Sequence, residues 1–463
     1  MGATNTPKLE IEKQFGKYVW ASMITMVIQG IYSIVDGLFL SNLIGDKGLS
    51  AIGVAWPIMS FVVALGTGIG CGGAVIMSMR QGAGDWDASN KARANTLIAL
   101  GIAGVGATVL FNIILTPALH AMGVYGELYD LAMKYARLMV MGCAVQIFSA
   151  GLPPILRNDK RTTAAMTIMV CSMGIHMVIL FVLLYGFGAT TEASGVASLA
   201  AQAFTITCCL SILFGNKKNP IRREHFEMDW SILARIAKNA VSPFGISLTP
   251  SLLILYHNVQ CIKYGGDIGI AVYSVITSTV GSWRLLLIGV AEGIQPLASF
   301  AYGANAYDAM KRIRNKALVT AISVSVFLFL FTLATTRFYP GMFGFSGELA
   351  AAIIPAVMLT SVQLAFTGVV RVSNSFFYAV GKYKYSLFMI YFDPLVMTPI
   401  LLAVLPRLFG MTGIWICAPV AQLILNIIAF FMYAAHDREI TRLRDAAAGS
   451  AAAPPDVSEG ACA

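Results

Sequence analysis

Seven ionisable side chains stand well inside long apolar stretches of this sequence: Asp36, His176, His257, Arg284, Glu292, Arg371 and Asp393. An apolar environment does not solvate charge, so each of these residues is a candidate functional residue. A carboxylate there can hold a proton or a cation, and an imidazole can relay protons near neutral pH. Opposite charges can also neutralise each other as ion pairs.

Asp36 is the first candidate, because it interrupts the first apolar stretch of the chain. Burial would favour its protonated form, and a cationic substrate could then compete with the proton. Asp36 is therefore predicted to couple proton or cation binding to substrate binding. The alternative is a carboxylate at a helix end, in contact with lipid headgroups.

Four further residues are candidates for proton relay or substrate binding: Tyr32, His176, His257 and Glu292. Either histidine would serve equally well as a neutral, hydrogen-bonded packing residue. Glu292 lies in a glycine-rich stretch and could be a second cation-binding carboxylate. Arg284, Arg371 and Asp393 are predicted to form structural ion pairs, together with Glu292 unless it has that second role.

Composition indicates a polytopic helical membrane protein. Of 463 residues, 57% are hydrophobic and 12% are charged, whereas soluble proteins have about 25% charged residues. The net charge of +9 does not indicate nucleic-acid binding, because the basic residues cluster in short loops: 24 fall on one predicted side and at most 6 on the other. By the positive-inside rule this predicts a multi-pass protein of the cell membrane with both termini cytoplasmic. No cleavable signal peptide is expected, so the first apolar run is a retained span.

Twelve transmembrane helices are expected, since apolar segments of about 20 residues or more recur along the chain. They are placed near 18–43, 49–78, 94–118, 131–156, 163–187, 193–214, 239–263, 269–299, 316–337, 350–379, 384–406 and 411–435. This predicts an all-α protein with a cytoplasmic N-terminal segment at 1–17, an N-terminal six-helix lobe at 18–214, a linker at 215–237, a C-terminal six-helix lobe at 238–435 and a disordered cytoplasmic tail at 436–463.

An internal repeat relates the two halves. Shifting the chain by 221 positions places Gly68 on Gly289 and Gly72 on Gly293. It also places Asp36 on His257. Six helices in each half make the repeat parallel, the arrangement typical of secondary transporters in which one lobe rocks against the other.

The sequence lacks the residue patterns that a metal site or an enzyme active site would need. The eight cysteines include no C-x-x-C pair, and seven of them lie in apolar segments, where cysteine acts as a small hydrophobe. No metal site is expected. No nucleophile–base constellation suggests an enzyme either.

Several motifs resemble the multidrug and toxic compound extrusion (MATE) family. They are Tyr32-x3-Asp36-Gly37 in the first helix, the glycine-rich stretch from 289 to 304 with its Gln-Pro-Leu and Tyr-Gly-Ala triplets, and Gly413-Ile-Trp415-x3-Pro419 near the last helix. The resemblance covers residues 10 to 435. It implies export of amphipathic cations in exchange for protons or sodium, with Asp36 at the position of the family's coupling carboxylate.

The chain departs from that family at positions that bear on the ion. Where many relatives carry Asn-x3-Asp on the fifth helix, this sequence has His176-x3-Leu180, and Ala201 replaces a common threonine. A sodium site needs several oxygen ligands, so the departures favour protons, and no cofactor is expected. The partners implied are small cationic substrates and the lipid bilayer, with the protein as a monomer. The alternative function is a lipid-linked saccharide flippase of the same superfamily, which would need a more cationic central cavity.

Overall fold

A computed structural model describes residues 12–187, 191–217 and 219–452. The described part is helical. Its elements are α2 (Phe15–Gly82), α3 (Trp86–Ala121), α4 (Glu127–Met141), α5 (Cys143–Asn158), α6 (Thr162–Phe187), α7 (Thr191–Phe214), η1 (Arg223–Phe226), α8 (Trp230–Gly303), α9 (Tyr307–Thr335), η2 (Thr336–Phe338), α10 (Tyr339–Met342), α11 (Gly347–Ala379), α12 (Tyr383–Phe392), η3 (Asp393–Met397), α13 (Thr398–Phe409) and α14 (Met411–Ala452).

Two of these helices are too long for one crossing. At 1.5 Å per residue, α2 and α8 would each exceed about 100 Å, three times the hydrocarbon thickness. Within the described residues α2 contains two spans, Phe15–Gly37 and Ser50–Gly82. Helix α8 is broken at Gly266, which has a φ of 55°. The repeat places Gly266 on Gly45, in the matching turn between the first two spans.

The predicted twelve-helix architecture is confirmed. The described part contains 10 candidate spans, or 11 when the bent pair α4–α5 is counted as one; the break in α8 supplies the twelfth. Two predicted spans are not straight helices. The fourth bends by 59° between α4 and α5, and the eleventh contains the π-helical turn η3, where Pro394 lacks a backbone donor.

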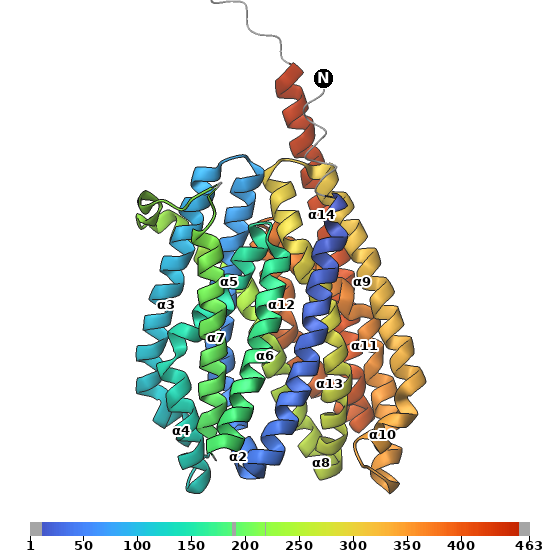
Figure 1. Cartoon of the computed structure of the whole chain (residues 1–463). Helices are drawn as coiled ribbons and strands as arrows, with labels where there is room; N and C mark the ends of the chain where they lie inside the picture. The colour runs from blue at the N-terminus through green and yellow to red at the C-terminus, as the bar shows by residue number, and fades with distance from the viewer. Residues whose placement is uncertain (1–11, 188–190, 218, 453–463) are drawn as a thin grey trace, which may run out of the picture.

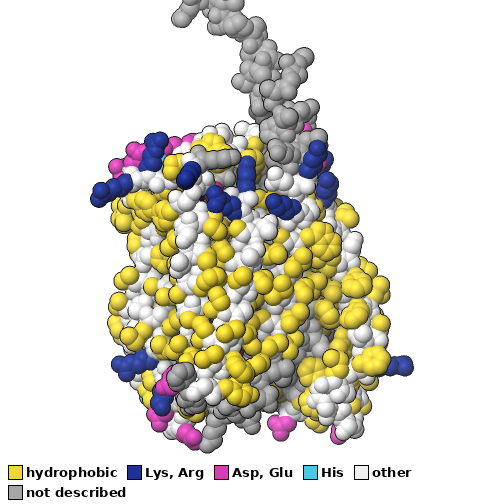
Figure 2. All heavy atoms as spheres, in the orientation of Figure 1, with side chains coloured by type: hydrophobic (Ala, Val, Ile, Leu, Met, Phe, Trp, Pro, Cys, Tyr) yellow, Lys and Arg dark blue, Asp and Glu magenta, His cyan; other side chains and the backbone are white. Residues whose placement is uncertain are grey.

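The helices stand side by side in two lobes, α2–α7 and α8–α14 (Figure 1). The beginning of α2 and the end of α14 lie at the same end of the molecule, here called the terminal end. Hydrophobic side chains cover the middle of the surface, and Lys and Arg gather near the terminal end (Figure 2). Among the exposed hydrophobic side chains are Ile113 and Phe430, both 70% exposed, as expected for a surface that faces lipid.

The linker between the lobes is attached to α3. His225 of η1 lies 3.0 Å from an Asp87 carboxylate oxygen, and Asn90 donates to Asn219 at 2.8 Å. Asp229 then begins α8, accepting from the backbone N–H groups of Ser231 and Ile232.

At the two chain ends the structure covers only part of the predicted segments. Residues 1–11 of the predicted N-terminal segment lie outside the described residues. Of the tail predicted as disordered at 436–463, the structure describes helix as far as Ala452, the end of α14; residues 453–463 lie outside the described part.

Candidate functional site

Asp36 lies in the first span, inside the N-terminal lobe. Its side chain is 23% exposed, and one carboxylate oxygen, Oδ1, is buried without a hydrogen-bond partner among the described residues. A buried carboxylate oxygen without a donor is costly while it is ionised. A proton or a bound cation would remove that cost.

Three of the predicted site residues meet here. His176 of α6 is 3% exposed, and its Nδ1 atom lies 3.7 Å from Asp36 Oδ1. The same Nδ1 atom lies 2.8 Å from the Tyr32 hydroxyl, with the rings edge to face at 5.5 Å. The structure therefore brings Asp36, Tyr32 and His176 together; their roles stay predictions.

The second imidazole nitrogen extends this cluster to a residue that the sequence had not marked. His176 Nε2 lies 3.2 Å from the hydroxyl of Ser198, on α7. A serine in an alanine-rich helix carries no signal of its own, and only the packing of α6 on α7 reveals it. Asp36, Tyr32, His176 and Ser198 are called the N-lobe polar cluster below.

His257 does not join this cluster. It lies in the C-terminal lobe, 6% exposed, with Nδ1 2.8 Å from the carbonyl oxygen of Leu253. Its ring stacks parallel to Tyr273 at 5.4 Å. The residues that the repeat places opposite each other, Asp36 and His257, thus occupy separate sites in separate lobes.

The predicted ion pairs of Arg284, Arg371 and Asp393 are not direct contacts among the described residues, although both guanidinium groups interact with the Asp393 carboxylate at longer range. Neither Arg284 nor Arg371 has a carboxylate oxygen within 4.0 Å or forms a hydrogen bond to a described residue. Asp393 lines the same cavity, but its oxygens accept from Thr398 at 2.7 Å and from Gln422 at 3.5 Å. Opposite charges inside one lobe did not imply contact, because neutral donors already surround the carboxylate.

Glu292 has a partner in the other lobe. Its carboxylate forms an ion pair with Arg157 of α5. One helical turn further along α8, Gln295 exchanges two hydrogen bonds with Asn158, at 2.8 and 3.1 Å. Sequence reasoning placed Arg157 in a loop and so missed it. These contacts join the two lobes near the terminal end.

The matched glycines pack across the same boundary. A Cβ atom on Gly72 would lie 2.7 Å from the backbone nitrogen of Ala240, in the opposite lobe. A Cβ atom on Gly293 would lie 2.7 Å from Val19 Cα. Each lobe therefore presents a glycine to the backbone of the other, and the two lobes pack closely at these points.

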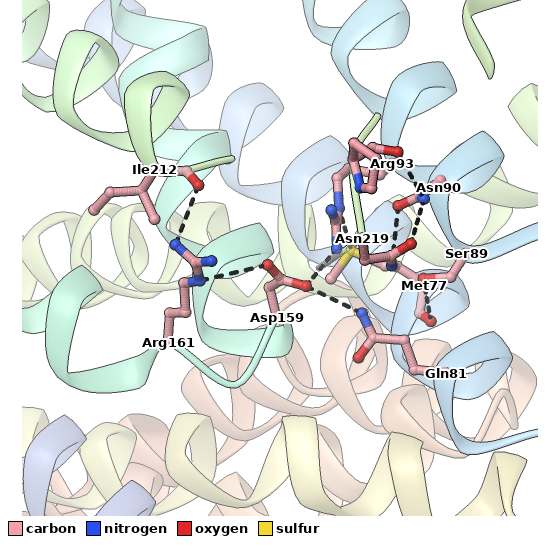
Figure 3. Close-up of polar contacts among 10 residues, drawn as sticks. Met77, Gln81, Ser89, Asn90, Arg93, Asp159, Arg161, Ile212 and Asn219 are labelled. Atoms are coloured by element: carbon pink, nitrogen blue, oxygen red, sulfur yellow. Dashed lines mark hydrogen bonds and ion pairs between the residues drawn. The ribbon is translucent and has the colours of Figure 1, made fainter. Parts of the chain in front are cut away.

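A further charged cluster supports the terminal end of the N-terminal lobe. The guanidinium of Arg93, fully buried, pairs with Asp159, which also accepts from Gln81 at 3.3 Å (Figure 3). Arg161 lies 3.9 Å from the same carboxylate. The repeat counterpart of Arg93, Arg314, pairs instead with Asp437 of α14, at 2.7 Å. Both halves of the repeat therefore keep the arginine, but the acid that pairs with it comes from different positions: Asp159 in one half and Asp437 in the other.

An apolar cavity of about 580 Å³ lies between the first span and α8. Ile31 and Ile34 line it from one lobe and Trp283 from the other, with Tyr339 and Phe343 nearby. Its size and lining suit a drug-sized amphipathic molecule. Asp36 follows Ile34 by two residues but does not line this cavity.

Two six-helix lobes related by an internal parallel repeat form the architecture that is typical of secondary transporters. The family model described as MatE matches residues 21–182 and 246–405, and the chain belongs to that family.

Similar proteins span nearly the whole chain. The multidrug export protein MepA of Staphylococcus saprophyticus subsp. saprophyticus is 23% identical over 418 residues, which cover 88% of this chain and 91% of that protein. MepA of Staphylococcus aureus (strain MSSA476) is 23% identical over 421 residues, with the same coverage. A solved structure, described as the outward-facing conformation of a multidrug resistance MATE family transporter of the MOP superfamily, superposes with a TM-score of 0.88. It is 23% identical and covers 93% of this chain and 97% of its own.

Proposed function

We propose that this chain is a secondary active exporter of amphipathic organic cations that exchanges them for protons across the cell membrane. The observation that carries the proposal is the N-lobe polar cluster, where Asp36 Oδ1 lacks a hydrogen-bond donor and an imidazole lies 3.7 Å away. The names of the MepA relatives, multidrug export proteins, support the cargo.

The proposed exchange follows from the cost of an uncompensated intramembrane charge. When Asp36 is ionised, a proton or a cationic substrate can neutralise it, but binding of one disfavours the other. The proton that Asp36 releases would pass to the His176 imidazole, whose Nδ1 lies 3.7 Å from Asp36 Oδ1, while the Ser198 hydroxyl hydrogen-bonds to Nε2 and orients the ring. Binding alternates between the sides of the membrane when the lobes rock.

Protons are favoured over sodium by the composition of the cluster. Sodium, like other hard cations, needs several oxygen ligands. Among the described residues, the groups that interact with Asp36 are the imidazole of His176 and the hydroxyls of Tyr32 and Tyr135, so few oxygen ligands surround the carboxylate. We further propose that the terminal end is cytoplasmic, because 24 Lys and Arg residues belong to the segments on that side.

The flippase alternative would require space beside cationic groups for a lipid-linked phosphate. A cavity of about 490 Å³ lined by Arg80, Arg235 and Lys238 lies at the terminal end, but Arg284 and Arg371, the arginines inside the spans, line cavities of only about 100 Å³ and 30 Å³. A saccharide pyrophosphate needs several times more. The apolar cavity of 580 Å³ lacks a basic side chain in its lining, so export of amphipathic molecules is the better fit.

The test is transport in reconstituted vesicles. An imposed pH gradient should drive efflux of an ethidium-type dye, and Asp36→Asn should abolish it. Asp130→Asn, at an exposed position in the first turn of α4, is the matched control and should transport normally. Efflux that a sodium gradient drives without a pH gradient would refute the proton assignment. Efflux unaffected by Asp36→Asn would refute the central role of that carboxylate.

A further inference from the structure

Two arginines of the C-terminal lobe have no direct ion pair among the described residues, although both interact at longer range with Asp393. Arg284 lies on α8 and Arg371 on α11, both within spans. No carboxylate oxygen lies within 4.0 Å of either, and neither forms a hydrogen bond within the described chain. Positive charge inside a span is costly unless it is neutralised, and the single carboxylate of Asp393 can balance only one of these two arginines.

The charge balance of the cavity is positive. Arg284, Arg371 and Asp393 line one cavity of about 30 Å³, and no other charged residue contributes to its lining. Asp393 is 6% exposed, and its oxygens are engaged by Thr398 and Gln422. Two guanidinium groups thus face one carboxylate that is already occupied.

Neutral donors and a second space adjoin these arginines. Thr249 and Asn374 line the same cavity with a hydroxyl and an amide. Arg284 also lines a neighbouring cavity of about 100 Å³, with His257 and Trp415. A cavity of about 10–15 Å³ holds one water, so the two cavities together have room for a halide or a carboxylate group with several waters.

We propose that Arg284 and Arg371 form an anion-binding subsite that takes the carboxylate of a zwitterionic substrate or a small inorganic anion. Guanidinium groups bind carboxylates through paired N–H donors. The substrate part of the inference rests on the proposed export function; the anion site itself does not.

A measurement of iodide binding tests the anion-binding subsite without the need for transport. Trp415 is 7% exposed and lines the cavity next to Arg284, so iodide bound there should quench its fluorescence. When iodide replaces chloride at constant ionic strength, purified protein should show saturable quenching that Trp415→Phe removes. Arg284→Met and Arg371→Met should weaken apparent iodide affinity at least tenfold. Arg337→Met, at an exposed position outside the spans' polar clusters, should leave it unchanged.

A transport assay in vesicles distinguishes a substrate carboxylate from an inorganic anion. It compares two amines, one with a free carboxylate and the other with the methyl ester of that carboxylate. Arg371→Met should lower efflux of the acid at least tenfold relative to the ester. If iodide binding needs the arginines but acid and ester behave alike, the ligand is an inorganic anion. If neither measurement depends on Arg284 or Arg371, the subsite is refuted. Failure of the wild type to export the ester would refute the proposed function and leave the binding result standing. Arg284→Lys and Arg371→Gln replace any methionine variant that does not fold, and both should weaken iodide binding.

Discussion

The polar residues singled out above contact partners that lie far away in the sequence. Asp36, Tyr32 and His176 form one cluster although 144 positions separate Tyr32 from His176. Glu292 pairs with Arg157, 135 positions away. A residue type indicates which chemistry is possible, but the partner decides which chemistry occurs.

Removing the Tyr32 hydroxyl should impair the N-lobe polar cluster while the protein stays folded. Tyr32→Phe deletes the group that lies 2.8 Å from His176 Nδ1, and a net hydrogen bond contributes about 1 kcal/mol. Proton-driven dye efflux should fall about fivefold to tenfold, since 1.4 kcal/mol corresponds to a factor of ten. Tyr125→Phe, at an exposed position, is the control. Unchanged efflux in Tyr32→Phe would show that this contact is only structural.

Breaking the buried pair of Arg93 and Asp159 should strongly destabilise the protein. The two side chains are 0% and 5% exposed, and removal of one partner of a buried pair costs about 3–5 kcal/mol. Arg93→Met should therefore lower the thermal midpoint in detergent far more than Arg161→Met, because Arg161 is 35% exposed and lies 3.9 Å from Asp159. Equal effects of the two substitutions would contradict this account.

At the scale of elements, irregular positions decide how the helices are placed. The break at Gly266 divides α8 into two crossings, and the bend at Gly142 separates α4 from α5. The glycines at 72 and 293 bring helices of opposite lobes into backbone contact. The repeat in the sequence shows the spacing of these glycines. It does not show which surfaces they contact.

Adding a side chain at these glycines should weaken closure of the terminal end. Gly72→Ala or Gly293→Ala would place a Cβ atom 2.7 Å from the opposing backbone, and overpacking of this kind costs about 1–3 kcal/mol. Thermal unfolding should show the loss. Gly106→Ala meets open space and should be neutral or stabilising. A stabilising effect at Gly72 or Gly293 would refute the tight contact.

The start of α8 should make stability depend on pH through Asp229. The pKa of Asp229 lies below its ordinary value, because the N–H of Ile232 and the ammonium of Lys91 favour the ionised carboxylate. This contribution is present above the unfolded-state pKa of about 3.9 and is lost as the pH falls through the folded-state pKa. The thermal midpoint of Asp229→Asn should lie below that of the wild type at pH 7, and the gap should close on acidification. A gap that persists at low pH would contradict the assignment.

The whole molecule is closed at its terminal end by contacts between the lobes. Charged contacts at this end include the ion pair of Arg157 and Glu292, with side chains 13% and 29% exposed, and the pairs of Glu12 with Arg312 and Lys316. Gln295 and Asn158 add hydrogen bonds beside the pair of Arg157 and Glu292. A transporter that rocks must break these contacts once in every cycle, so they set how readily this end opens.

Neutralising Glu292 should favour opening of that end. Glu292→Gln removes a charged hydrogen bond, which contributes about 1.5–3 kcal/mol, so the open population should rise at least tenfold. Spin labels in place of Trp86 and Lys384, exposed positions of opposite lobes, should report longer distances. Glu439→Gln, whose pair with Lys382 stays within the C-terminal lobe, is the control. Identical distance distributions in Glu292→Gln and the wild type would exclude a role in closure.

The sequence by itself determined the membrane class, the twelve crossings and the duplicated halves. These follow from composition and periodicity, because hydrocarbon imposes its length and polarity on every span. It also marked Asp36, because a carboxylate in an apolar run is costly wherever the helix packs. The tertiary structure alone decided the contacts: Ser198 beside His176, Arg157 rather than Arg284 or Arg371 opposite Glu292, and, within the described residues, two arginines that have no direct ion pair. Ion pairs and hydrogen bonds form over a few ångströms, and that proximity depends on how helices far apart in the chain are rotated and packed against each other, which periodicity does not encode.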